Sequence, residues 1–420
     1  MAGGCPLLAE FAFAAALVLC ASVALLLVAD LYLLAVHLGR ARREIACERA
    51  LVGDRAALGD PPSLCVQLPV FNEAQVGAAI DSLCGLDWPR ERLEILVLDD
   101  STDEASDIAA ERIERWRSRG IDIRHLRRGH RRDHKAGALA DAFRQTTAPY
   151  IAIFDVDYRP EPGFLLEVMR PLLAEPRAAF VQARLAYRNR EYSLFTRAQA
   201  TGLDAYSAFE QAGRAWAGVP APFNGTCGVW RRAAIEEAGG WSGKSLLEDF
   251  DLSLRAFARG WGAIILMTVS VVGELPESPA ALISQRRRWA LGTGQSSRTQ
   301  PWRLLGLMRP DRAAVFGLLA LQHAFLSILL PAAALAAVVS GKATALVAFA
   351  IALALVVGLK SIGAALAGRA VGRPLGLAFV IDLMAMWLME AVLLPIRAKA
   401  LAQGLLGRQA EPFVRTPKKG

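Results

Sequence analysis

The pattern of hydrophobic and polar residues divides the chain into an apolar beginning, a long mixed centre and an apolar end. Residues 11–29 carry no charged side chain, and after Asp30 the apolar run resumes to Val36. A helix of about 20 apolar residues crosses a bilayer, so we expect one spanning helix here. The stretch lacks a basic segment before it and a small-residue cleavage site after it, which favours a retained anchor over a secretory signal peptide.

The C-terminal part of the chain repeats this apolar pattern. Residues 313–341 and 343–359 carry no charge, and residues 375–396 are apolar apart from Asp382 and Glu390. Each stretch is close to the length of a membrane span, so about three further hydrophobic segments are predicted. Acids inside such a stretch are candidates to line a path through the membrane.

Basic residues near these segments predict their orientation, because Lys and Arg gather on the cytoplasmic side of membrane helices. Arginines flank both ends of the central region: Arg40, Arg42, Arg43, Arg298, Arg303, Arg309 and Arg312. The central region is therefore predicted to face the cytosol. Three further full spans would place Arg415, Lys418 and Lys419 outside, so residues 375–396 are predicted to be re-entrant or interfacial.

Between the apolar ends, residues 60–292 alternate short apolar runs with helix-like patterns. This alternation predicts an α/β fold with a mostly parallel sheet, covered on both faces, and with ligands at the carboxyl ends of its strands. The expected strands are residues 64–70, 93–100, 121–126 and 150–157, and the expected helices are residues 74–86, 103–118 and 135–145.

Composition narrows the class of protein. The 420 residues are 54% hydrophobic and carry a net charge of +8, which suits a surface held near anionic lipid or a site for a negatively charged ligand. Six scattered cysteines form no CxxC pair, which argues against a zinc site or a disulfide framework and fits a reducing compartment. The sequence also lacks the glycine-rich fingerprints of dinucleotide and P-loop sites.

Polar side chains gather where three predicted strands end. The first strand runs into Pro69 and Glu73, the second ends at Asp100, and the fourth ends at Asp155 and Asp157. Each acid alone is an ordinary candidate for a helix cap, but the ends of parallel strands share one edge of a sheet. Two carboxylates in a D-x-D spacing there suit Mg²⁺ or Mn²⁺, which would bridge a diphosphate.

A basic stretch at residues 127–139 offers candidates to bind that diphosphate. Lys135, with one of two nearby arginines, would meet phosphate oxygens at the start of a helix, and the alternative is a solvated basic loop. A zinc site at His130 and His134 lacks further ligands of suitable spacing. Nucleic acid is not expected as a partner, because the acids at the strand ends would repel its phosphates unless metals intervene.

Two further groups of residues are candidates for chemistry. Glu248 and Asp249 stand at the start of a predicted helix, either as acids that favour its dipole or, for one of them, as a general base. Gln285, Arg288 and Trp289 share one face of a later helix. That face suits a basic amphipathic helix at a membrane surface, or alternatively stacking on a sugar ring with donors left for phosphate.

Taken in order and spacing, these stretches resemble the membrane-embedded glycosyltransferase family 2 enzymes, in the cellulose synthase-like A (mannan synthase-like) and ceramide glucosyltransferase-like branch. The motifs that carry the resemblance are QLPVFNE, VLDDSTDEA, HKAGALADA, IFDVD, FNGTCGVWRR, LEDFDLSLRA and QRRRW, with FVRTPKKG at the C-terminus. The resemblance implies a cytosolic GT-A type (Rossmann-like) domain at residues 41–300. A transmembrane anchor at residues 1–40 and a transmembrane or interfacial region at residues 301–420 would flank it.

The resemblance implies roles on the donor side of the site. Pro69, Glu73 and Asp100 would line the nucleotide pocket. Lys135 would lie beside the diphosphate. The metal motif would be Asp155 and Asp157, with Asp157 the direct ligand of Mg²⁺ or Mn²⁺.

The resemblance also implies roles on the acceptor side. Asp249 would be the base that deprotonates the acceptor hydroxyl, and Glu248 would support it. Leu247 departs from the threonine usual before this pair, which removes a capping hydrogen bond but no charge. The residues expected at the membrane interface, near donor phosphate and acceptor, are Gln285, Arg288 and Trp289.

The activity implied is an inverting transfer of a hexose from a UDP- or GDP-linked sugar to a growing β-linked, glucan- or mannan-like glycan. The alternative is a single transfer to a lipid such as ceramide, diacylglycerol or polyprenyl phosphate. A non-catalytic sugar-nucleotide sensor would be favoured by loss of the base or metal acids, and the sequence retains them all. The partners to expect are the donor, a glycan or lipid acceptor, membrane lipids and envelope export subunits.

Overall fold

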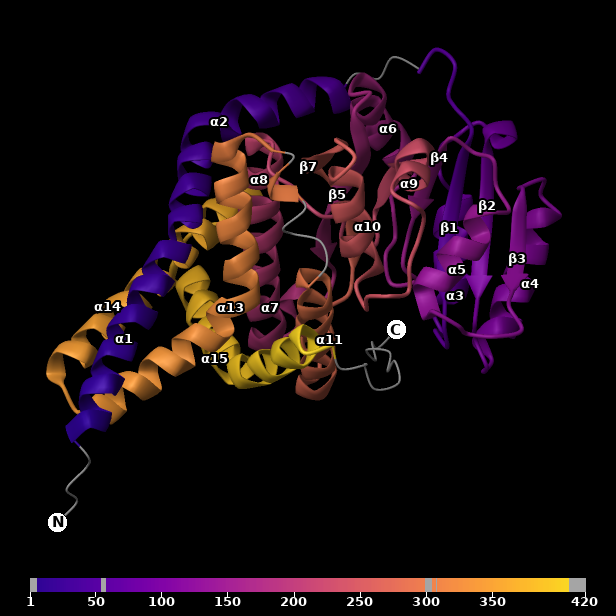
Figure 1. Cartoon of the computed structure of the whole chain (residues 1–420). Coiled ribbons are helices and arrows are strands. Elements are labelled where there is room, and N and C mark those ends of the chain that lie inside the picture. The colour runs from indigo at the N-terminus through magenta and orange to yellow at the C-terminus, as the bar shows by residue number, and fades with distance from the viewer. Residues whose placement is uncertain (1–5, 54–57, 299–303, 307, 408–420) are drawn as a thin grey trace.

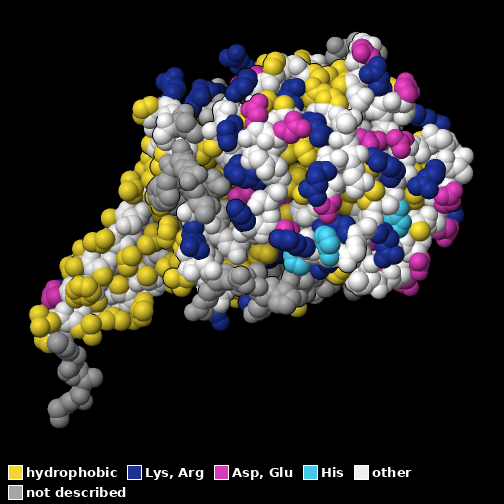
Figure 2. All heavy atoms as spheres, turned by 45° about the vertical axis from the view of Figure 1, so that its right-hand side comes forward, with side chains coloured by type: hydrophobic (Ala, Val, Ile, Leu, Met, Phe, Trp, Pro, Cys, Tyr) yellow, Lys and Arg dark blue, Asp and Glu magenta, His cyan; other side chains and the backbone are white. Residues whose placement is uncertain are grey.

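The computed structural model describes residues 6–53, 58–298, 304–306 and 308–407. A sheet with flanking helices forms one side of the molecule, and long helices from both ends of the chain form an arm on the other side (Figure 1). Figure 2 shows apolar side chains covering the arm, whereas charged side chains are spread over the sheet side. The arm thus has a surface that suits lipid and the sheet side a surface that suits water.

Seven strands form one sheet in the order β3-β2-β1-β4-β6-β5-β7. Neighbouring strands are parallel except where β6 pairs with β4 and β5, to which it runs antiparallel. The predicted mostly parallel sheet is therefore confirmed. The strands are β1 (Leu64–Val70), β2 (Leu93–Asp99), β3 (Ile123–Arg127), β4 (Tyr150–Ile153), β5 (Ala178–Tyr187), β6 (Gly228–Arg231) and β7 (Gly262–Gly273).

The first four strands lie close to the predicted ranges, and β4 shows an informative difference. It ends at Ile153, so Asp155 and Asp157 follow the strand instead of belonging to it. Val156 between them is buried in the apolar core. The backbone N–H of Tyr158 donates to the Asp155 carbonyl at 3.1 Å, which closes a turn. The two acids are thus carried by a turn that its buried valine anchors.

Helices cover both faces of the sheet, each over its own apolar core. One core, which includes Ile80 and Phe164, joins the strands to α3, α4 and α6. The other core includes Leu139 and Leu252 and lies under α5, α9 and α10. Close packing on both faces fixes the edge where β1, β2 and β4 end. The helices of this part are α3 (Val76–Cys84), η1 (Arg90–Arg92), α4 (Ala105–Arg117), α5 (His134–Phe143), α6 (Phe164–Ala174), η2 (Arg190–Tyr192), α9 (Arg232–Glu237) and α10 (Glu248–Phe257).

The arm combines helices from both ends of the chain, and α1 packs against α13 and α14. By length and hydropathy, three described helices could cross a membrane, at residues 6–53, 343–370 and 377–405, or four if the bent helix α13 counts as one span. The helices of the arm are α1 (Pro6–Leu26), α2 (Val28–Gly53), α13 (Pro310–Ser340), α14 (Ala343–Ala370) and α15 (Leu377–Leu405).

Most of residues 375–396, which the sequence predicted to be re-entrant or interfacial, lies in an unbroken helix, and the bend in the arm lies in a different helix. α15 is an unbroken helix that could span a membrane by itself, whereas α13 bends by 62° between residues 310–323 and 325–340. Asp382 of α15 does not line a path either. Its buried carboxylate accepts hydrogen bonds from Arg197 at 2.8 Å and Arg373 at 2.9 Å, so its charge is paired within the protein. The C-terminal basic residues behind that prediction, and the FVRTPKKG motif, lie outside the described residues.

Several helices join the sheet to the arm. α7 and α11 contact α15, and the π-helical segment η3 contacts α14. α2 continues past residue 40, and Glu48 accepts hydrogen bonds from the backbone N–H groups of Met267 at 2.8 Å and Thr268 at 2.6 Å in β7. The anchor helix is thus continuous with a helix that packs on the sheet. The joining helices are α7 (Leu194–Asp204), η3 (Ala205–Gln211), α8 (Ala212–Ala217) and α11 (Pro279–Ser297).

Candidate active site

A single cavity of about 960 Å³ begins at the carboxyl ends of β1, β2 and β4 and continues between η3, α11 and the helices of the arm. Every residue that the sequence placed in the site lines this cavity: Pro69, Glu73, Asp100, Lys135, Asp155, Asp157, Glu248, Asp249, Gln285, Arg288 and Trp289. The fold therefore brings together residues that are far apart in the chain. On the arm side the lining includes Glu390, the second acid that the sequence singled out in α15.

The end of the cavity beside β1 and β2 carries an aromatic ring, that of Phe71, and a carboxylate, that of Asp100, held in place by an arginine. The ring of Phe71 lies against the guanidinium of Arg131, whose carbon is 3.2 Å from the ring centroid. Asp100 accepts a hydrogen bond from Arg128 Nε at 2.8 Å, and less than a tenth of either side chain is exposed. This bond raises the pKa of Arg128 above its ordinary value. An aromatic ring next to a carboxylate suits a nucleobase and the hydroxyls of its ribose.

Lys135 is the cation at the centre of the site. It stands in the first turn of α5, and its Nζ donates to Asp155 Oδ1 at 2.6 Å and to the Gly225 carbonyl at 2.8 Å. The same Nζ is 3.8 Å from Glu248 Oε1. Burial lowers the pKa of Lys135, but the carboxylates of Asp155 and Glu248 outweigh burial and raise it. The ammonium group therefore stays charged, as a group that binds phosphate oxygens must.

Asp249 has the chemistry of a base that works near neutral pH. It lies at the start of α10, where its Oδ1 accepts a hydrogen bond from the Phe250 N–H at 2.7 Å. Burial, and then the negative charge of Glu248, raise the pKa of Asp249 to about 7, although Lys135 opposes the shift. Burial also raises the pKa of Glu248. A carboxyl group with a pKa near the working pH can take up a proton and release it again.

Gly225 lets the backbone approach these charged groups. Its φ is +78°, and a Cβ at this position would lie 2.7 Å from Asp249 Oδ2 and 3.5 Å from Lys135 Nζ. Only glycine adopts this conformation without strain and leaves this space open. The next residue, Thr226, accepts a hydrogen bond from the Asp155 N–H at 2.8 Å. The FNGTCG stretch therefore lies against Asp249, Lys135 and Asp155 and holds them together.

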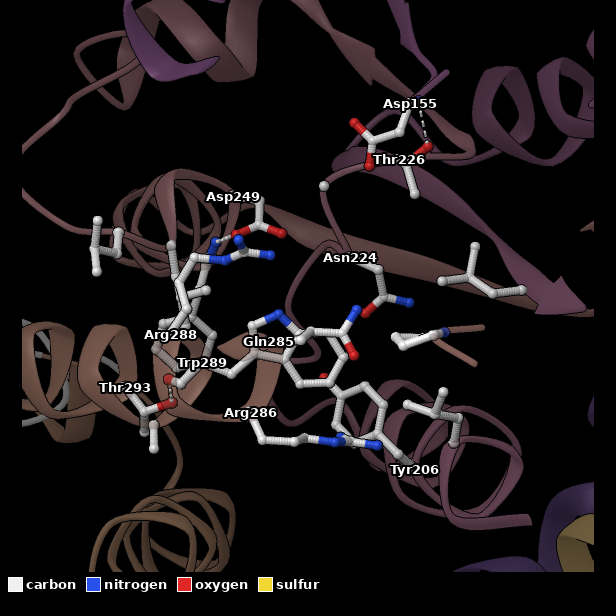
Figure 3. Close-up of a pocket in the computed structure, with 18 of the residues that line it drawn as sticks. Asp155, Tyr206, Asn224, Thr226, Asp249, Gln285, Arg286, Arg288, Trp289 and Thr293 are labelled. Carbon is white, nitrogen blue, oxygen red and sulfur yellow. Dashed lines mark hydrogen bonds between the residues drawn. The ribbon is translucent and has the colours of Figure 1, made fainter. Parts of the chain in front are cut away.

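α11 forms the next part of the wall and faces α10. A Cβ at Gly292 would lie 2.5 Å from Cγ of Leu247, so the two helices meet closely at this point. Figure 3 shows the Arg288 side chain between Asp249 and Trp289. Burial lowers the pKa of Arg288, and the carboxylates of Glu248 and Asp155 counter that effect. A second cation thus faces the acids that surround Lys135.

The donor atoms of Asp155 and Asp157 fit a hard divalent cation such as Mg²⁺ or Mn²⁺. Both carboxylates lie on the turn after β4, and both side chains line the cavity. In the described part of the chain, no group of three or more His, Cys, Asp or Glu residues is placed to hold a metal. The two aspartates would therefore leave coordination positions for phosphate and water oxygens, which is how Mg²⁺ is held in many nucleotide sites.

Reasoning from the sequence missed other residues of the cavity wall. Tyr206 comes from η3, a segment for which no pattern signalled a role, and Asn224 comes from the loop before β6. Arg286 was visible inside QRRRW, but it is not one of the residues that the Q-x-x-R-W motif specifies. In Figure 3 Tyr206 and Arg286 lie on the side of the cavity away from Asp155, and Asn224 lies between them and Asp155.

Comparison with known proteins shows which families and folds the chain is similar to. The family model described as "Glycosyl transferase family group 2" matches residues 150–359, half of the chain. Two plant proteins of Arabidopsis thaliana are similar in sequence. Glucomannan 4-beta-mannosyltransferase 9 is 38% identical over 249 residues, which are 58% of this chain and 47% of that protein. Glucomannan 4-beta-mannosyltransferase 2 is 42% identical over 236 residues, which are 55% of this chain and 44% of that protein.

The matched segments thus span about half the length of these plant relatives. A solved structure, the mannosyltransferase PcManGT from Pyrobaculum calidifontis in complex with GDP-Man and Mn²⁺, has the same fold. The match has a TM-score of 0.58 and 20% sequence identity, and covers 91% of this chain and all of the other. The family match and the GT-A fold lead to one conclusion: the chain belongs to the glycosyl transferase family group 2.

Proposed function

We propose that the protein transfers a hexose from a nucleotide sugar to a growing β-linked glycan, with inversion at the anomeric carbon. The observation that carries this proposal is the place of Asp249. A carboxyl group whose pKa is raised to about 7 lines the same cavity as the cation Lys135, whose charge acts on it, and the ring of Trp289. A base between a site for a charged leaving group and a surface for a sugar is the arrangement that glycosyl transfer needs.

The donor would lie at the sheet end of the cavity. Phe71 and Asp100 would contact the nucleoside, and Pro69 and Glu73 would line the same pocket. Lys135 and Arg288 would bind the diphosphate oxygens and stabilise the charge that develops as the bond to the sugar breaks. Asp155 and Asp157 would hold a divalent cation, which when bound supplies Lewis-acid stabilisation of the same phosphates.

Asp249 would remove the proton from the acceptor hydroxyl. The hydroxyl oxygen then attacks the anomeric carbon from the side opposite the nucleoside diphosphate, and the bond from that carbon to the phosphate oxygen breaks. One displacement of this kind inverts the configuration at carbon. Glu248 supports the base electrostatically, since its negative charge raises the pKa of Asp249, while Lys135 lies 3.8 Å from its carboxylate.

A glycan is the acceptor we favour over a lipid. The arm end of the cavity is lined both by polar side chains such as His323 and by apolar ones such as Leu326 and Val356, so the preference rests on the similar proteins. The similar plant proteins are named glucomannan 4-beta-mannosyltransferases, and the solved structure of this fold holds GDP-Man. GDP-mannose is therefore the first donor to test.

The setting we propose is a multi-pass membrane protein whose sheet side faces the cytosol, where nucleotide sugars are made. The apolar surface of the arm and the arginines at both ends of the sheet domain support this orientation. Residues 41–300 would form the catalytic domain, with residues 1–40 and 301–420 in or at the membrane. Envelope export subunits would be partners for a product that leaves the cell.

The experiment that tests this function supplies purified protein in lipid nanodiscs with labelled UDP- and GDP-sugars, one at a time. The product is then divided into a lipid extract and an oligosaccharide fraction. We expect label from one donor in oligosaccharides that lengthen with time. Label confined to the lipid extract would overturn the chain-extension proposal, and the absence of transfer from every donor would overturn the proposed activity.

A further inference from the structure

Arg286 occupies an unusual position in the cavity wall. Its guanidinium carbon lies 4.7 Å from the centroid of the Trp289 ring, one helical turn further along α11. Its Nε is buried and has no hydrogen-bond partner in the described part of the chain. Glu390 of α15, whose negative charge acts on Arg286, already pairs with Arg397. Because a guanidinium carries only donors, Arg286 needs an acceptor that this site does not supply.

The direction of α11 shows which part of a substrate Arg286 would meet. Gly292 marks the point where α11 touches Leu247, two residues before the base Asp249. Trp289 lies one turn back from Gly292, and Arg286 lies one turn further back, about 9 Å from Gly292 along the helix axis. Moving from Asp249 to Trp289 to Arg286 therefore leads away from the donor. Arg286 would contact the part of an acceptor that lies beyond the reacting sugar.

The surroundings of Arg286 favour a neutral, hydroxyl-bearing ligand over an anion. Figure 3 shows the side chain extending towards Tyr206, on the side of the cavity where Trp289 also lies. Tyr206 is carried by the π-helical segment η3, and such segments occur frequently at functional sites. Glu210 of the same segment and Glu390 also line the cavity, and each is paired with an arginine, so neither pair adds net positive charge that would attract a phosphate. Aromatic rings with a few donors are typical of a site for a sugar ring.

On these contacts, and resting on the proposed function, we infer that Arg286, with Trp289 and Tyr206, forms a subsite for the second sugar of the acceptor glycan. Arg286 is a positioning residue. Its guanidinium donates hydrogen bonds to hydroxyl or ring oxygens of that sugar, whose face packs against the aromatic rings. The subsite holds the chain so that its terminal hydroxyl stays within reach of Asp249. Arg286 makes no contact with a single-sugar acceptor.

The test compares acceptors of one to four β-linked hexose units with the donor that proves active, in nanodiscs that hold wild type, R286Q or R287Q. Arg287 is the matched control, since it is an arginine of the same helix and is not among the residues that line the cavity. We expect R286Q to raise the acceptor KM roughly 10- to 100-fold for two or more units, the usual cost of losing hydrogen bonds to a charged group. The KM for the donor and for a one-unit acceptor should stay unchanged, and R286K should recover part of the loss.

Other results would overturn the subsite. These are an equal rise in KM for one-unit and longer acceptors, a raised donor KM, or a profile for R286Q that matches R287Q. Equal thermal midpoints for the variants and wild type separate a binding effect from unfolding. If wild type transfers sugar to no saccharide, the proposed function fails and takes the subsite with it. If wild type extends oligosaccharides but R286Q does not change how the acceptor KM depends on acceptor length, the subsite alone fails.

Discussion

The two ends of the cavity are built differently. At the sheet end, charges are packed in pairs on a rigid edge, such as Lys135 with Asp155 and Arg128 with Asp100. At the arm end, the wall carries aromatic rings and the guanidinium of Arg286, and it belongs to α11 and η3, which contact the arm. Preorganised charge suits a leaving group that becomes more negative. At the arm end the carboxylates of Glu210 and Glu390 are each paired with an arginine, which leaves the aromatic rings and Arg286 to meet a neutral chain that must move on after each transfer. The sheet end thus suits the charged donor, and the arm end suits a neutral chain.

The largest predicted effect is on the transfer rate, when the proposed base Asp249 is removed. Asp249→Asn should slow transfer by roughly 10²- to 10⁴-fold, the usual contribution of a general base, and leave donor binding nearly unchanged. The measurements are the single-turnover transfer rate and the donor Kd by calorimetry. Near wild-type transfer would rule out Asp249 as the base.

Asp249→Asn should remain folded. The coupling between the pKa of Asp249 and the free energy of unfolding gives the sign of its effect on stability. The pKa of Asp249 is raised from 3.8 to about 7 in the folded protein. The stability this group contributes is present below its unfolded pKa and lost as pH rises through 7, because ionisation then costs free energy in the fold. Asp249→Asn cannot ionise. Its thermal midpoint at about pH 8 should therefore be no lower than that of wild type.

A smaller effect is expected at the sheet end from Asp157→Asn. Removing one carboxylate from the D-x-D pair should raise the Mg²⁺ or Mn²⁺ concentration for half-maximal rate by at least about tenfold, the low end for losing even an outer-shell partner. Chelation by EDTA should stop wild-type transfer, and either metal should restore it. Asp251→Asn is the matched control, because this acid also stands in the region of the site but pairs with Arg255. A rate unaffected by EDTA would exclude the metal.

The smallest effect is expected where the two ends meet, at Gly292. Alanine is a better helix former than glycine by about 1 kcal/mol, but the new Cβ would overlap Leu247, and overpacking costs about 1–3 kcal/mol. Gly292→Ala should therefore lower the thermal midpoint and reduce transfer a few-fold by moving α10 and its base. Gly39→Ala in α2, where nothing lies within 4 Å of the new Cβ, should not lower the midpoint. Equal midpoints for both variants would show that α10 and α11 do not meet closely.

The sheet end was predictable from the sequence because its residues directly follow apolar runs that can be identified as strands. Apolar runs marked β1, β2 and β4, and the rule that parallel strands end at one edge placed Asp100 beside Asp155 before any coordinates. The contacts Lys135–Asp155 and Lys135–Glu248 could not be predicted in this way. They depend on Gly225, whose positive φ brings a distant loop against both.

The arm end was less predictable because its arrangement depends on packing between distant segments. No periodicity distinguishes the π-helical turn that carries Tyr206 from an α-helix, since the difference is one residue in the hydrogen-bond pattern. Asp382 was a candidate to line a path through the membrane because a sequence cannot show that Arg197 and Arg373 neutralise it. The bend in α13 likewise had no signal that separated it from the other apolar runs.

The pH dependence of the single-turnover transfer rate tests the central claim most directly. Asp249 must be deprotonated to accept the proton, and its pKa is raised to about 7. With saturating donor, metal and acceptor, the rate should fall about tenfold for each pH unit below 7 and level off above it. Asp249→Asn should remove this dependence along with most of the rate. A wild-type rate that stays constant from about pH 5.5 to about pH 8 would contradict the account.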